Sequence, residues 1–292
     1  MPIIDITQYS LTAGETLSAT AKRAEVWLLL EYNAVWGAKA LPESDLTPEV
    51  KHFLEQQEKT IPNLRFQFIK RDAPSSGIMF YVARTGLVAP FLYRFRLGSY
   101  EDLLDINIAD LVTARSEYTM SEERLFVVCT NGKRDAACAK YGLPLYNAMR
   151  EAANGVWQTT HFGGHRFAAT LACLPHGVMY GRVPLDMAQT VVESYQKNRV
   201  LLEYYRGCSA YDPPTQAAED HLRTLTGETR LGGLRHHQTE LIGEKQWAVM
   251  FQASSGEQYS LQVRALQSEF AVFEGTRDES PEPVMTYLVE MG

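Results

Sequence analysis

The segment RLFVVCTNGKRDAACAKYGLPLYNAMREAANGVWQTTHFGGH (residues 124–165) decides the fold of this chain. Its first five residues, 124–128, are rich in Val, Leu and Phe and predict a strand that ends at Cys129. A helix is predicted next, with Pro144 near its first turn and the turn dipeptide Asn154-Gly155 after its end. VWQTT then predicts a second short strand. Strand, helix and strand in this order indicate an α/β fold.

The same order of elements is predicted twice along the chain. Within residues 113–206, the unit above is followed by two more strands, AATLACL and GVMYGRV, and by a helix that starts at Pro184. Residues 20–112 repeat this order with AEVWLLLEY, EVKHFLEQQEK, NLRFQFIKR, IMFYVAR, FLYRFRL and SYEDLLDINIADLV. Each half therefore has the thioredoxin-like order, in which helices flank a mixed sheet, and the halves resemble a degenerate duplication.

A third segment follows the two halves. From residue 207 onward, a Pro-Pro turn leads into an amphipathic helix. Four short strand patterns separated by turns follow: WAVMFQA, YSLQVRA, EFAVFEG and VMTYLVE. We therefore expect three parts: an N-terminal thioredoxin-like lobe without cysteines (1–112), a second thioredoxin-like lobe (113–206), and a C-terminal helix with a small antiparallel β appendage (207–292). The predicted fold class is α/β.

Composition narrows the class of protein. Of the 292 residues, 45% are hydrophobic and 22% charged, as in ordinary globular proteins, and the net charge of −7 argues against non-specific nucleic-acid binding. No signal peptide is evident, and the longest apolar run, Val26 to Leu30, is too short for a membrane span. Four cysteines do not make a disulfide scaffold in a chain of this length. We expect a cytoplasmic protein.

Two cysteines and two histidines form the chemically most informative pattern. Cys129 and Cys138 are a C-x8-C pair, and His161 and His165 are an H-x3-H pair. Thiolates and imidazoles are the ligands of iron–sulfur clusters and zinc. The eight residues between the cysteines are too many for a zinc-knuckle hairpin and suit a loop around a wider, two-iron cluster. Gly163-Gly164 disfavours a helix between the histidines and predicts a tight loop.

Three stretches resemble the sucrase/ferredoxin-like family, a branch of the thioredoxin-like ferredoxins. They are FVVCTNGKRDAAC (126–138), HFGGHRFAATL (161–171) and PHGVMYGRV (175–183), and the likeness extends over about residues 20–225. The resemblance implies a [2Fe–2S] cluster whose ligands fall on Cys129, Cys138, His161 and His165. It also implies one-electron transfer or redox sensing with an unidentified redox partner protein, rather than an enzyme with its own substrate.

Mixed ligation has a physical consequence for such a cluster. Two imidazoles in place of two thiolates remove two negative charges, so the reduction potential should rise, as in Rieske centres. Backbone N–H groups of Gly163 and Gly164 would act in the same direction if they donate to the cluster. Lys133, Arg134 and Arg166 lie close by in sequence. They are either ordinary surface charges or groups that tune the cluster and dock a partner.

Two other readings use the same residues. A phosphatase- or sulfurtransferase-like enzyme would use Cys129 as nucleophile, with Arg134 five positions later in a loop that cradles an anion. Phosphatase loops need C-x5-R, whereas this chain has C-x4-R, and that reading leaves Cys138 and both histidines unexplained. A structural zinc site is the third possibility, because the donor types fit. Visible absorption separates the readings, since only the iron–sulfur protein is red-brown.

Overall fold

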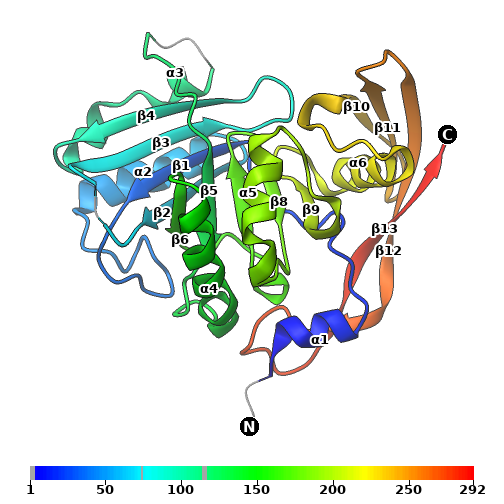
Figure 1. The fold of residues 1–292 in the computed structure, drawn as a ribbon, viewed down its shortest axis with the longest axis horizontal. Coiled ribbons are helices and arrows are strands. Elements are labelled where there is room, and N and C mark those ends of the chain that lie inside the picture. Colours follow the sequence, from blue (N-terminus) through cyan, green and yellow to red (C-terminus); the bar gives the residue numbers. More distant parts are fainter. Residues whose placement is uncertain (1–3, 74, 114–116) are drawn as a thin grey trace.

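The computed structural model describes residues 4–73, 75–113 and 117–292. It has the predicted mixed α/β class, with a curled nine-stranded sheet, flanking helices and a separate C-terminal sheet of four antiparallel strands (Figure 1). Among the described residues, no helix is both long and apolar enough to cross a bilayer.

The first half forms one flank of the large sheet, in the order β4-β3-β1-β2. Strand β1 is parallel to β2 and antiparallel to β3, and β3 is antiparallel to β4. All six residues of β1 are buried, as expected for a central strand that is covered on both faces. The elements are α1 (Ile6–Thr12), β1 (Val26–Glu31), α2 (Pro48–Thr60), β2 (Leu64–Lys70), β3 (Ile78–Arg84), β4 (Phe91–Leu97), the 3-10 helix η1 (Glu101–Asp105) and α3 (Ile108–Val112).

The second half repeats these pairings in the order β6-β5-β7-β8, and β9 adds a further strand. Strand β5 is parallel to β6 and antiparallel to β7, so the predicted strand–helix–strand–strand–strand–helix order is confirmed in both halves. An antiparallel pairing of β2 with β6 joins the halves into one sheet. The elements are β5 (Leu125–Cys129), α4 (Ala136–Ala152), β6 (Val156–Thr159), the 3-10 helix η2 (His165–Phe167), β7 (Leu171–Leu174), β8 (Val178–Tyr180), the 3-10 helix η3 (Leu185–Met187), α5 (Ala188–Gln196), the 3-10 helix η4 (Leu202–Tyr204) and β9 (Tyr205–Cys208).

Some local predictions differ from the structure. The helix expected over residues 99–112 is broken into η1 and α3, because Ile106 is extended and the Asn107 side chain caps a new helix. Helix α4 begins at Ala136, so Pro144 lies in the helix interior and not, as predicted, near the first turn. Cys138 lies inside that first turn and not in the loop before the helix. Neither α1 nor β9 was expected from the sequence.

The C-terminal sheet has the order β10-β11-β12-β13, all antiparallel. Two of the predicted strands, YSLQVRA and EFAVFEG, belong to one long strand, β12. The fourth strand of the sheet is β10, which was not predicted because most of its residues are polar. The β12–β13 hairpin extends toward α1 (Figure 1). There Tyr9 packs edge-on against Phe273. The elements are α6 (Pro213–Thr226), the 3-10 helix η5 (Leu231–Gly233), β10 (Leu234–Gly243), β11 (Gln246–Ala253), β12 (Gln258–Val272) and β13 (Glu282–Met291).

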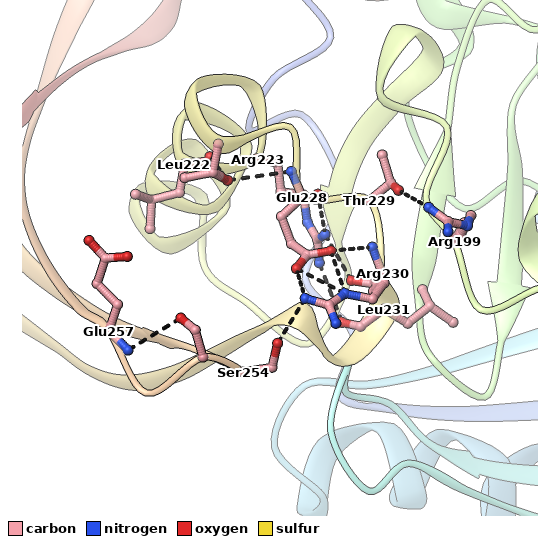
Figure 2. Close-up of polar contacts among 11 residues, drawn as sticks. Arg199, Leu222, Arg223, Glu228, Thr229, Arg230, Leu231, Ser254 and Glu257 are labelled. Carbon is pink, nitrogen blue, oxygen red and sulfur yellow. Dashed lines mark hydrogen bonds and ion pairs between the residues drawn. The ribbon is translucent and has the colours of Figure 1, made fainter.

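A buried arginine fixes α6 to the segment that enters the C-terminal sheet. Arg223 is fully buried and pairs with the equally buried Glu219, with 2.7 Å between Nε and Oε1. Its other nitrogens donate to the backbone carbonyls of Glu228, Arg230 and Leu231 (Figure 2). Most polar atoms of this guanidinium are therefore satisfied inside the protein, as a buried charge requires.

The turn between β7 and β8 holds a half-buried histidine that should make the fold sensitive to acid. His176 Nδ1 lies 2.8 Å from the Tyr195 hydroxyl, and burial lowers the pKa of His176 to about 4. The unfolded chain therefore binds this proton first on acidification. The free energy of unfolding should be unaffected by this group above the ordinary histidine pKa of 6.5. It should fall by roughly 2–3 kcal/mol as the pH drops from there to 4. Urea unfolding of wild type and His176→Gln at several pH values checks this, and equal pH slopes would contradict it.

Candidate metal centre

The candidate ligands lie at one end of the parallel pair β5 and β6. Cys129 is the last residue of β5, and it pairs with Thr159, the last residue of β6. His161 follows two residues after that strand end, and Cys138 lies in the first turn of α4. The carboxyl ends of parallel strands are the usual place for sites in α/β sheets.

Three of the four predicted residues form one group of donor atoms. The ligand atoms of Cys129, Cys138 and His161 all lie within 4.8 Å of one another. His161 Nδ1 is 3.7 Å from Cys129 Sγ and 3.6 Å from Cys138 Sγ. His165 lies on the far side of His161, where its Nδ1 is 3.1 Å from His161 Nε2 and the two rings stack. The structure therefore places two thiols and two imidazoles in a continuous row.

Close packing of α4 on β5 brings the two cysteines together. A side chain at Gly142 would place its Cβ 2.0 Å from the Cys129 carbonyl oxygen, so the helix rests directly on the strand. Asp135 caps the helix by accepting from the Ala137 N–H at 2.9 Å. Both features orient the first turn of α4, and they thereby hold the Cys138 sulfur near that of Cys129.

The predicted tight loop between the histidines is confirmed. Gly163 and Gly164 have φ values of +105° and +79°, which favour glycine. Arginine side chains from elsewhere in the chain hold this loop. Arg65 donates to the Phe162 carbonyl at 3.0 Å, and Arg206 donates to the Gly163 carbonyl at 3.4 Å.

The C-terminal hairpin reaches the same site, which sequence reasoning missed. Thr276, in the loop between β12 and β13, donates through its N–H and its hydroxyl to Asp135 at 3.0 and 2.9 Å. A Cβ at Gly275 would lie 3.3 Å from His165 Nε2. A segment more than 100 residues away in sequence therefore covers the imidazole. A glycine in an irregular loop carries no signal that would have revealed this contact.

The electrostatics favour the metal-binding protonation states of Cys129 and His165, whereas the pKa of Cys138 is shifted in the opposite direction. A hydrogen bond from Cys138 and a contact with His161 lower the pKa of Cys129, against the opposing effect of burial. The hydrogen bond to Cys129, together with burial, raises the pKa of Cys138. Burial and the neighbouring His161 lower the pKa of His165 to about 4, so its ring is neutral at pH 7. A thiolate and a neutral imidazole are the states that bind metal.

The basic residues near the motif have different environments. Lys133 and Arg134 are exposed in the loop before α4, although the charge of Arg134 acts on His165. Arg166 is mostly buried and pairs with Glu15 at 2.9 Å, with Glu274 at 3.6 Å as a more exposed second partner. Only Arg166 is thus built into the structure around the site.

Comparison with known proteins gives a match that agrees with this geometry. The family model described as sucrase/ferredoxin-like matches residues 16–207, well over half of the chain. The chain belongs to the sucrase/ferredoxin-like family. No curated protein and no solved structure matches it.

The family match of this sucrase/ferredoxin-like protein covers the large sheet but not the C-terminal part of the chain. It contains all four candidate ligands and ends within β9, so α6 and the C-terminal sheet lie outside it. Gly275 and Thr276, which cover one side of the site, therefore come from a part of the chain that the family match does not include. Membership of the family and a cysteine–histidine group able to hold a metal are the two facts on which function can be argued.

Proposed function

We propose that this protein binds a [2Fe–2S] cluster through Cys129, Cys138, His161 and His165, and that it serves as a one-electron carrier or redox sensor. The observation that carries the proposal is the convergence of two thiols and two imidazoles at one end of β5 and β6. This donor set matches mixed Cys₂His₂ ligation of a two-iron cluster. The cluster would supply the redox chemistry, while these residues would hold it and fix its charge.

A thiol enzyme fits the site less well. The side chains of Cys129 and Cys138 are each only 1% exposed, so neither sulfur can approach a substrate without a large rearrangement. Arg134 is exposed in its loop, and no contact ties its guanidinium to Cys129 as an anion cradle requires. The low pKa of Cys129 therefore supports metal ligation better than nucleophilic catalysis.

Zinc is the second candidate, because the same donor set suits a tetrahedral Cys₂His₂ site. The row of donors gives a reason to prefer a cluster. His161 Nδ1 lies near both sulfurs and its Nε2 lies 3.1 Å from His165 Nδ1, so the fourth donor lies beside the compact group of the other three and not within it. An elongated donor set is better suited to two metal ions than to one.

The state of the cysteines indicates the compartment in which this protein works. All four are free and buried, and two of them, Cys173 and Cys208, lie in the sheet away from the donor row as ordinary core residues. Free thiols and a thiolate-bound cluster both suit a reducing compartment, so we place the protein in the cytoplasm. Its partner in this proposal is another redox protein.

The test is an analysis of anaerobically purified protein. We expect visible absorption, with about two iron atoms and two sulfides per chain, as a [2Fe–2S] cluster requires. His165→Cys should keep a cluster but lower its reduction potential, because a thiolate replaces a neutral imidazole. A colourless protein that contains zinc and no sulfide would overturn the proposal. So would a His165→Cys potential equal to that of wild type.

A further inference from the structure

Two arginines are completely buried among the residues that the structure describes, and only one of these two has a carboxylate partner. Arg223 pairs with Glu219, as described above. Arg206, in β9, is 1% exposed, and no carboxylate oxygen within the described parts of the chain lies within 4.0 Å of its guanidinium. An unpaired buried cation is costly, and proteins retain such groups where another charge compensates for it.

Neutral groups alone hold the Arg206 side chain. Its Nε donates to the Thr20 hydroxyl at 3.0 Å, and Nη2 donates to the Thr20 carbonyl at 2.5 Å. Its Nη1 donates to the carbonyl of Gly163, between the two candidate histidine ligands. A Cβ at Gly164 would lie 2.3 Å from Nη2, so glycine there leaves the space that the guanidinium fills. The cation is thus built against the histidine loop.

Two further arginines lie near Arg206, around the ring of Phe167. The guanidinium carbons of Arg166, Arg182 and Arg206 lie 4.7, 5.2 and 4.9 Å from the centre of the Phe167 ring. Glu15 is the buried carboxylate that faces this group, and it pairs with Arg166. Burial and the charge of Arg166 lower the pKa of Arg206 to about 9, which leaves it charged at pH 7. The positive charge here exceeds the negative charge before any cofactor is considered.

A metal centre that has accepted an electron would carry the negative charge that this cation lacks. The charge of Arg206 interacts with the thiolate of Cys129, and its guanidinium contacts the loop that carries His161 and His165. We propose that Arg206 is a fixed counter-charge for the metal centre, which stabilises the centre when it holds an added electron and so raises its reduction potential. This inference rests on the proposed cluster. Because the guanidinium is buried, salt in the solvent should screen its effect little.

The experiment measures the midpoint potential of the loaded protein by spectroelectrochemical titration. In Arg206→Met the reduced form loses its nearby cation, so the ratio of reduced to oxidised centre at a fixed potential should fall about tenfold, or 59 mV for one electron. The shift should persist at about 1 M salt. Lys22→Met is the matched surface control, since the Lys22 side chain passes over Gly163 from the exposed side. Its smaller shift should vanish in high salt.

A second variant tests the same electrostatic effect without depending on whether Arg206→Met folds. Glu15→Gln removes the buried carboxylate beside the three arginines and keeps the side-chain shape, so the potential should rise. If both loaded variants had the reduction potential of wild type, the proposed role of Arg206 as a counter-charge would be wrong. It would also be wrong if high salt abolished the shift in Arg206→Met. If Arg206→Met does not fold, the sign of the Glu15→Gln shift decides. A wild-type protein without iron would instead refute the proposed function.

Discussion

A Cys138→Ser protein should fold and yet bind metal more than about 100-fold more weakly than wild type. Serine is a poor ligand for iron or zinc, whereas the Cys138 sulfur lies 3.6 Å from His161 within the donor group. The fold should persist because Asp135 still caps α4 and Gly142 still seats this helix on β5. Metal and sulfide counts on purified protein, together with circular dichroism, check both parts.

The matched control for this prediction is Cys173→Ala. Cys173 is as deeply buried as Cys138, but it packs in the core around β7 and not at the donor group. That variant should lose stability through a small cavity and keep its full metal content. Equal metal content in Cys138→Ser and wild type would remove Cys138 from the site.

Arg223→Met should produce the largest loss of stability, about 3–5 kcal/mol, because it leaves the Glu219 carboxylate buried without its cation. It also removes the hydrogen bonds that tie α6 to the carbonyls before β10. Urea unfolding monitored by circular dichroism measures the change. The double variant Arg223→Met/Glu219→Leu should recover much of the loss, since no charge then remains buried.

An exposed ion pair nearby serves as the comparison for that prediction. Arg230 pairs with Glu228 at the surface, and its side chain is 59% exposed. Arg230→Met should therefore change the free energy of unfolding by less than about 1 kcal/mol. If Arg223→Met had an equally small effect, the buried pair would contribute nothing to the attachment of α6.

The parts of the structure that follow from local sequence were predictable. Alternating and apolar runs predicted the first four strands of each half, and the repeated order of elements predicted a mixed sheet flanked by helices. The candidate ligands were visible because their residue types and spacing are unusual, and Gly163-Gly164 required a loop. Strand β10 was hidden because most of its residues are polar and exposed, which removes the apolar pattern of a buried strand.

The surroundings of the site depend on contacts between distant segments, and no local pattern reports them. Arg206 reads as an ordinary residue in a short strand, and only its burial against Gly164 reveals an unpaired cation. Gly275 and Thr276 belong to a polar hairpin loop that meets the site because β12 and β13 extend far enough to reach it. Sequence spacing identifies donor atoms, whereas the charge and cover around them are products of tertiary structure.

The pairing of β2 with β6 has a consequence for the role of the N-terminal half. The N-terminal half has no cysteine, yet it grips the residue before His161: Thr160 donates to the Gln67 side chain at 2.6 Å, and its N–H donates to the Phe68 carbonyl at 3.1 Å. The half without candidate ligands therefore holds the residue next to His161 in place. Its strands contribute to the position of that imidazole although they carry none of the candidate ligands.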